Sequence, residues 1–242
     1  MTIMLALGAG IFFAAYKARH MVPPPVAEKL GLRADISEIR AHQIPILTSQ
    51  LAHSDLSFSA PVFIRIFKEE AELEVWIEDD SQFSLFKTYP ICNFSGDLGP
   101  KLREGDRQSP EGIYNVTRDA LNPNSSFHLS FNLGFPNRFD RSHDRTGSFL
   151  MVHGNCVSVG CYAMTDPMIE EIYVLVEAAL SGGQHAVPVH AFPFRMTPER
   201  MAQAAHSPWF GFWEQLSTIY EQFETTRQIP TVEVIDGRYA VN

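Results

Sequence analysis

The sequence is poor in cysteine and in basic residues, and it contains no internal repeat. Its 242 residues include three cysteines, an odd number that cannot all pair, so one thiol is expected to stay free. Lysine and arginine number 19 against 28 acidic residues, and the basic residues form no long block. The formal net charge of −9 therefore argues against a nucleic-acid partner. A hydrophobic fraction of 45% is ample for a core.

The sequence also lacks an apolar run long enough to span a bilayer. Residues 2–16 are apolar and uncharged, which is short of the ~20 residues that a spanning helix needs. No basic residue precedes this run, and no cysteine occurs before Cys92, which excludes a lipoprotein signal. We expect residues 1–20 to be a signal peptide or an N-terminal membrane anchor, with the protein in the periplasm. A buried N-terminal helix is the alternative, and Pro23–Pro25 would form a stiff spacer.

One short segment carries the residues of a catalytic site. Residues 150–163 read LMVHGNCVSVGCYA, in which an apolar strand ends at His153 and Gly160 precedes Cys161. A glycine before the cysteine allows a sharp turn that presents bare amide groups. A cysteine acyl-transfer enzyme needs a thiol, a base within hydrogen-bond reach and backbone donors for the oxyanion. The segment therefore predicts a cysteine nucleophile with a histidine base.

The expected roles of these residues follow from thiol chemistry. A free thiol has a pKa near ~8.5, so little of it is thiolate at neutral pH. His153 would raise the reactive fraction as an imidazolium partner or as the base that takes the proton. The amides of Gly160 and Cys161 would line the oxyanion hole, and Ser158 would form a hydrogen bond within the turn.

Other interpretations of the same residues remain open. Cysteine often simply packs in a core, and a histidine at a strand end can cap a carbonyl. His153, Cys156 and Cys161 could supply three zinc ligands, but a structural zinc site takes four, and no second half-motif is present. The candidates for a fourth ligand are His143, His185 and His190. Cys92 and Cys156 could pair as a disulfide or remain buried thiols.

The pattern along the chain predicts an α+β domain dominated by β-structure, with helices on its outside. Apolar and β-branched runs predict strands at 61–67, 72–77, 83–91, 113–117, 126–132, 149–152, 187–192 and 231–235. A helix is expected from Asp166, with Pro167 at its first position and an end at Gly182-Gly183. Two more are expected to begin at 197–198 and 207–208, and the aromatic stripe of the last should pack on the sheet.

Several segments together resemble a known family. VHGNCVSVGCYAMTD is similar to the active-site segment of the L,D-transpeptidase (YkuD-domain) family, in its YafK-like branch. Further similar segments are RIFKEEAELEVWI, GPKLREGDRQSPEGIY, SFHLSFNLGFPNRFD and FPFRMT, so the resemblance covers roughly residues 61–205. Typical members have a longer insert before the cysteine and often an arginine after it. Here the gap is compressed and Tyr162-Ala163-Met164 follows.

The resemblance implies a YkuD-like catalytic domain that acts on peptidoglycan without a cofactor or metal. Cys161 would attack a carbonyl of the diaminopimelate residue in a stem peptide and form a thioester. The carbonyl of Gly154 would hold His153 in the correct tautomer, in place of an aspartate. An amine would resolve the thioester in transpeptidation, and water would resolve it in hydrolysis, including release of a wall-bound outer-membrane lipoprotein.

Three arginines are candidates for holding the carboxylates of a stem peptide. Arg138 and Arg145 lie in a long polar loop, and Arg195 lies in the FPFRMT segment. A guanidinium group matches a carboxylate with two parallel hydrogen bonds. Surface solvation is the alternative for each of them.

The expected organisation has four parts and leaves one competing function. The parts are an N-terminal signal or anchor (1–20), a linker and lead-in segment (21–58), the catalytic domain (59–206) and a packed C-terminal helix and strand (207–242). The competing function is a non-catalytic cell-wall-binding protein of the same fold, against which the intact Cys161 and His153 argue. A small zinc-binding domain is the third interpretation.

Overall fold

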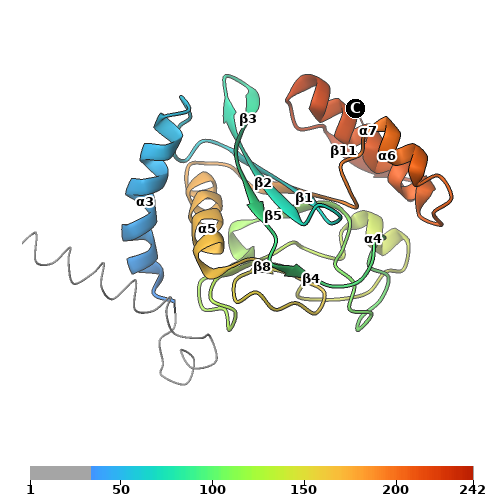
Figure 1. The fold of residues 1–242 in the computed structure, drawn as a ribbon, viewed down its shortest axis with the longest axis horizontal. Coiled ribbons are helices and arrows are strands. Elements are labelled where there is room, and N and C mark those ends of the chain that lie inside the picture. The colour runs from blue at the N-terminus through green and yellow to red at the C-terminus, as the bar shows by residue number, and fades with distance from the viewer. Residues whose placement is uncertain (1–33, 242) are drawn as a thin grey trace, which may run out of the picture.

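Two five-stranded sheets form the centre of the protein in the computed structural model, which describes residues 34–241 (Figure 1). The first sheet has the order β3-β2-β1-β10-β5, and the second has the order β4-β9-β8-β7-β6. The strands of the first sheet are β1 (Val62–Phe67), β2 (Glu72–Asp79), β3 (Gln82–Pro90), β5 (Gly112–Val116) and β10 (Val187–Phe192). Those of the second sheet are β4 (Asn93–Phe94), β6 (Leu121–Asn122), β7 (Ser130–Asn132), β8 (Met151–His153) and β9 (Tyr162–Ala163).

The central strand β1 of the first sheet is buried on both faces. It pairs in parallel with β10 and antiparallel with β2, so residues of alternate parity face opposite layers. Ile64 and Ile66 belong to the cluster that includes the second sheet and α5 (Asp166–Ser181). Phe67 belongs to the cluster beneath α7 (Phe210–Thr226). The first sheet therefore separates two apolar cores.

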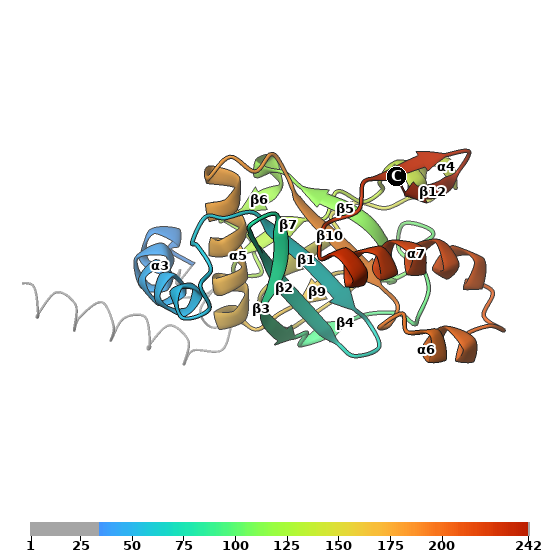
Figure 2. The same cartoon turned by 90° about the horizontal axis from the view of Figure 1, so that it is seen from above.

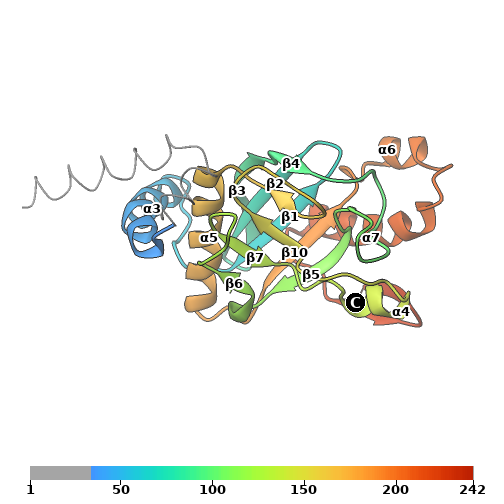
Figure 3. The same ribbon diagram turned by 90° about the horizontal axis from the view of Figure 1, so that it is seen from below.

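Helices cover the two ends of this arrangement. The helix α3 (Ile36–Ala52) packs on the outer side of α5, at the end opposite α6 (Pro198–Gln203) and α7 (Figure 2). The short helices are α4 (Arg138–Ser142) and the 3₁₀ turn η1 (Arg118–Ala120). The hairpin of β11 (Val232–Ile235) and β12 (Arg238–Val241) lies next to α4 and α7 (Figure 3). The predicted α+β class, mainly β with outer helices, is confirmed.

Most of the predicted elements are present, with three corrections. The N-cap position of α5 is Thr165, which forms no side-chain cap hydrogen bond, and Asp166 is the first residue of the helix. The strand expected over 126–132 is limited to β7, because His128 has a positive φ of 70° and breaks the extended run. The last strand expected at 231–235 pairs with β12 and extends neither large sheet.

The aromatic stripe of the last predicted helix packs inside the protein, as expected. Trp213 and Leu216 of α7 are buried in one cluster with Phe67 and Phe192 of the first sheet. Within residues 34–241 no helix is both long and apolar enough to cross a membrane. The signal or anchor expected at residues 1–20 lies outside the described residues.

Candidate active site

Two parallel strands of the second sheet bring His153 and Cys161 together. In the register of β8 and β9, Val152 lies opposite Tyr162 and His153 opposite Ala163. Cys161 directly precedes β9, one position further back along the same register. Residues two apart on a strand point to the same face, so the two side chains emerge diagonally on one face of the sheet. The strand order thus supplies the juxtaposition that the sequence spacing suggested.

The histidine is buried and oriented by its own backbone. His153 is 2% exposed, and its Nδ1 lies 2.6 Å from the carbonyl oxygen of Gly154. Since a carbonyl only accepts, Nδ1 must carry the proton, which leaves Nε2 of the neutral ring as the basic atom. The ring of Phe127 packs against the imidazole at 4.7 Å between centroids. Burial lowers the pKa of His153 below its ordinary 6.5, although the bond to Gly154 opposes this shift.

The thiol of Cys161 lies against the chain that leads into β8. It accepts a hydrogen bond from the Met151 N–H at 3.4 Å and lies 3.5 Å from the carbonyl of Phe149. Burial raises the pKa of Cys161 above the ordinary value of a thiol, opposed by the Met151 amide and by the charge of Lys101. Within residues 34–241 no hydrogen bond joins this thiol to the imidazole. Both pKa shifts favour the uncharged form of the group concerned.

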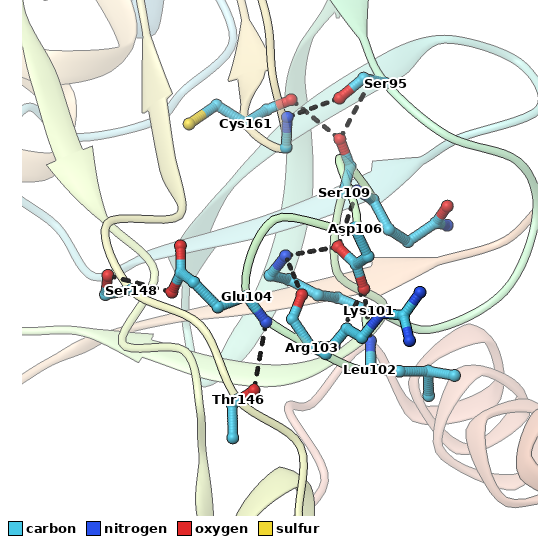
Figure 4. Close-up of polar contacts among 12 residues, drawn as sticks. Ser95, Lys101, Leu102, Arg103, Glu104, Asp106, Ser109, Thr146, Ser148 and Cys161 are labelled. Atoms are coloured by element: carbon cyan, nitrogen blue, oxygen red, sulfur yellow. Dashed lines mark hydrogen bonds and ion pairs between the residues drawn. The ribbon is translucent and has the colours of Figure 1, made fainter.

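The backbone of the turn before β9 is held by hydroxyl groups. The Gly160 N–H donates to Oγ of Ser95, and the Cys161 carbonyl accepts from Ser109 Oγ at 2.9 Å (Figure 4). The same carbonyl accepts from Ser158 Oγ at 2.7 Å. The Gly160 amide, predicted to line the oxyanion hole, is thus bonded to Ser95. Among the described residues the Cys161 N–H has no partner, so it is the predicted donor that remains open.

The loop that carries Ser95 and Ser109 is anchored by a buried lysine. Lys68 is fully buried, and its Nζ donates to the carbonyls of Asp97, Gly99 and Ser109 and to Glu111 Oε1, at 2.7 to 3.2 Å. No local pattern indicates this role, because these contacts join the residue after β1 to a loop about thirty to forty residues away.

The tip of the same loop is organised around one carboxylate. Asp106 accepts hydrogen bonds from the amides of Leu102, Arg103 and Gln108 at 2.9 to 3.0 Å, and from Lys101 Nζ at 2.5 Å (Figure 4). These donors keep the pKa of Asp106 below its usual value, against the effect of burial. The loop that carries Ser95 and Ser109 is therefore held by hydrogen bonds to Lys68 and, around residues 101–108, by hydrogen bonds to Asp106.

A disulfide joins Cys92 to Cys156, and Cys161 is the free cysteine. The pairing that the sequence left open is thus formed in this structure. It removes Cys156 from the zinc interpretation, since a disulfide sulfur is not a thiolate ligand. Among residues 34–241 no cluster of three histidine, cysteine or acidic side chains is arranged to hold a metal.

Two of the three arginines predicted to hold substrate carboxylates are paired with internal carboxylates. The side chain of Arg145 is buried against Asp140 at 2.9 Å. Arg195 pairs with Glu72 at 2.5 Å and Glu74 at 2.7 Å. Because these guanidinium groups already bind internal carboxylates, the prediction for both has no support here, and Arg138 alone of the three is exposed without an ion pair to the described residues.

An open groove of about 400 Å³ is lined by residues next to Cys161, although neither Cys161 nor His153 is among them. Phe149 and Met151, whose backbone atoms contact Cys161, form part of its wall. Polar side chains form much of the rest, namely Asn115, Thr117, Asp119, Asn122 and Asn132. The groove offers hydrogen bonds to an extended polar ligand close to the nucleophile.

The fold and the site define the class: an α+β protein with a cysteine–histidine pair at the ends of two parallel strands. No protein-family model matches the chain. The chain is 49% identical over 183 residues to the protein of Escherichia coli K12 named "Putative L,D-transpeptidase YafK", covering 76% of this chain and 74% of that one. The same identity and coverage hold for the protein of that name in Escherichia coli O157:H7. The chain therefore belongs to the L,D-transpeptidase family, in its YafK-like branch, as the resemblance predicted.

Two solved structures are more distant neighbours. The helical cell shape determining protein Pgp2 of Campylobacter jejuni is 17% identical, with a TM-score of 0.46. The match covers 77% of this chain and 79% of that one. Bd1075 of Bdellovibrio bacteriovorus is 19% identical, with a TM-score of 0.40 over 68% and 58% of the two chains. The family assignment rests on the YafK relatives.

Proposed function

We propose that this protein is a periplasmic cysteine enzyme of peptidoglycan remodelling, in which Cys161 forms a thioester with a diaminopimelate-containing stem peptide. The observation that carries the proposal is the placement of the only free cysteine of the described chain on the same sheet face as a buried, backbone-oriented histidine. The membership in the L,D-transpeptidase family supports the peptide substrate.

The protonation states define the first step. Because the thiol and the imidazole are both neutral, Nε2 of His153 takes the thiol proton as the sulfur attacks the substrate carbonyl. A carbon–sulfur bond forms, and the carbonyl electron pair moves to the oxygen, where the Cys161 N–H stabilises it. Collapse of this oxyanion breaks the carbon–nitrogen bond, and the imidazolium returns the proton to the leaving amine. The thioester remains on Cys161.

The second step decides between transfer and hydrolysis. An amine that attacks the thioester gives a new amide, and water gives a free carboxylate. The open groove beside the thiol admits a polar peptide and does not by itself exclude water. Hydrolysis that releases wall-bound lipoprotein and transpeptidation therefore remain the two forms of the proposed activity.

The disulfide supports an exported location. Structural disulfides persist in oxidising compartments such as the bacterial periplasm and are rare in the cytosol. Cys92 and Cys156 are both solvent-exposed, so their bond would be open to reduction in the cytosol. A periplasmic setting keeps this bond intact while Cys161 stays reduced.

The test uses lipoprotein-bearing sacculi incubated with the purified full chain and with its Cys161→Ala variant. Muropeptides released afterwards are analysed by mass spectrometry. We expect changes in the muropeptides that Cys161→Ala reduces by roughly 1,000-fold or more, because the nucleophile is absent. New cross-links between diaminopimelates would identify a transpeptidase, and loss of lipoprotein remnants from tripeptide stems would identify a hydrolase. Identical muropeptides from both proteins would favour the non-catalytic wall-binding protein.

A further inference from the structure

The turn that presents Cys161 has a backbone conformation that needs support from outside. Gly160 has a φ of +103°, and Asn155 and Cys156 have φ values of +66° and +50°. Residues 154–161 connect two parallel neighbouring strands, a connection that usually takes about a dozen residues or more. Positive φ values in side-chain-bearing residues persist only where the surroundings hold them. The direction of the amide groups in this turn therefore depends on its contacts.

Hydroxyl groups from a distant loop hold both sides of this turn. Ser95 Oγ accepts the Gly160 N–H, and Ser109 Oγ donates to the Cys161 carbonyl at 2.9 Å. The two serines are also joined to each other, since the Ser95 N–H donates to Ser109 Oγ at 3.2 Å. In Figure 4 the sulfur of Cys161 points away from both serines, so they contact the backbone of the nucleophile and not its thiol.

The peptide unit between these two anchors bears the open Cys161 N–H. Peptide units are planar, so each one moves as a single body about the Cα atoms beside it. The hydroxyls bind the units before Gly160 and after Cys161, which fixes how the unit between them can rotate. Among the described residues its N–H has no partner. The orientation of this N–H therefore depends on two hydroxyl groups that bond to the backbone on either side of it.

We propose that Ser95 and Ser109 are positioning residues that aim the Cys161 N–H at the oxyanion of the acyl-transfer step, an inference that rests on the proposed function. Ser109 is fully buried, and its carbonyl accepts from the buried Lys68 at 3.2 Å. Its N–H donates to the Ser95 carbonyl at 2.9 Å. The hydroxyl therefore acts from a fixed position, as a preorganised oxyanion donor requires.

Two reagents separate aiming of the amide from the reactivity of the thiol. With p-nitrophenyl acetate, the sulfur attacks a carbonyl, an oxyanion develops, and p-nitrophenolate leaves with the carbon–oxygen bond pair. With iodoacetamide, the sulfur displaces iodide at a saturated carbon, and no oxygen gains charge. An N–H aimed at the oxyanion accelerates only the first reaction. Cys161 is the free thiol of the described residues, and Cys161→Ala gives the background.

The experiment measures both rates in the full chain with its disulfide intact. We expect Ser95→Ala and Ser109→Ala to slow acylation by about 10- to 100-fold, less than the ~100- to 1,000-fold cost of removing an oxyanion donor, because the N–H is misdirected and not lost. Their alkylation rates should be unchanged, and Ser95→Thr, which keeps the hydroxyl, should restore acylation. Ser148→Ala is the matched control, because that exposed hydroxyl contacts Glu104 and not the turn.

Three results would overturn the proposal. Unchanged acylation in Ser95→Ala would show that the hydroxyl does not aim the amide. A parallel loss of acylation and alkylation would show a general effect on the turn or the thiol. If alkylation proceeds but the unsubstituted protein is not acylated above the Cys161→Ala background, the proposed nucleophile fails as well. Ser95 is half-buried, so its variants provide the answer even if the buried Ser109→Ala does not fold.

Discussion

At the scale of single residues, burial decides how the cysteine and histidine react. Burial raises the pKa of Cys161 and lowers that of His153, so both shifts favour the uncharged forms. A preformed thiolate–imidazolium pair is thereby disfavoured relative to a neutral pair. Of the two roles that the sequence left open for His153, the structure favours the base that takes the proton during attack.

The acidic limb of the pH–rate profile tests this role. Since the folded pKa of His153 lies below 6.5, its base form is lost only at pH values below that point. The rate of acylation by p-nitrophenyl acetate should rise with pH through an apparent pKa below 6.5 and be level near neutrality. The alkylation rate of Cys161 by iodoacetamide should keep rising into the alkaline range, because burial raises the pKa of the thiol. An alkylation rate that is already at its maximum at neutral pH would instead indicate a preformed thiolate–imidazolium pair.

The residues of the site divide by how far their contacts reach along the chain. His153, Gly154 and Cys161 were found from the sequence, because they lie within one short segment. Ser95 and Ser109 were missed, since they meet that segment across separations of 65 and 52 residues. Nothing in the local pattern around either serine marks it as a contact of the nucleophile.

At the scale of elements, the disulfide secures the short connection between β8 and β9. Cys92 precedes β4, which pairs with β9, and its N–H donates to the Ala163 carbonyl at 2.9 Å. The bond to Cys156 therefore fastens the middle of the connection to the sheet edge beside it. Asn155 and Gly160, which both have a positive φ, lie on either side of this point, so the tether restricts the turn in addition to the serines.

A variant without the disulfide should lose both stability and rate. The sequence separation of 64 residues between Cys92 and Cys156 predicts a fall of roughly 4 kcal/mol in the free energy of unfolding for Cys92→Ser/Cys156→Ser, by the chain-entropy estimate. Urea unfolding measures this change, with Ser148→Ala as the reference. Acylation should slow because the connection gains freedom. An unchanged acylation rate in a destabilised variant would show that the serines alone hold the turn.

The element predictions failed where a contact overrode the local pattern. The run 126–132 alternates like a strand, yet the Gly154 N–H bonds to the carbonyls of Phe127 and Leu129. The Phe127 ring packs on His153, and the chain turns at His128. The alternation described the short β7 correctly and could not reveal that the preceding residues cover the active-site histidine.

At the scale of the whole molecule, a buried ion pair connects the first sheet, the loop beside the nucleophile and α7. Lys68 directly follows β1, and its Nζ lies 3.0 Å from Glu111 Oε1. Both side chains are fully buried. The second oxygen of Glu111 accepts the Trp213 indole N–H at 2.9 Å. Burial lowers the pKa of Lys68, and the Glu111 carboxylate opposes this shift. The C-terminal helix is thereby tied to the loop that holds the nucleophile turn.

Removal of one partner should destabilise the whole fold. Glu111→Gln leaves the Lys68 charge buried without a counter-charge, which costs about 3 to 5 kcal/mol of unfolding free energy. The double variant Lys68→Met/Glu111→Gln should recover part of this loss, because no charge remains buried. Glu69→Gln is the control, since its partly exposed pair with Arg200 is worth about 1 kcal/mol or less. Urea unfolding that shows equal losses for Glu111→Gln and Glu69→Gln would contradict this role of the buried pair.

The sequence by itself determined the family and the α+β class and predicted the pair of Cys161 and His153, because these depend on local patterns and a short segment. The tertiary structure decided the Cys92–Cys156 disulfide, the neutral state of the nucleophile pair and the serine contacts to the turn. It also showed that Arg145 and Arg195 bind internal carboxylates. The physical reason is that burial and long-range hydrogen bonds exist only after strands distant in sequence have been packed together.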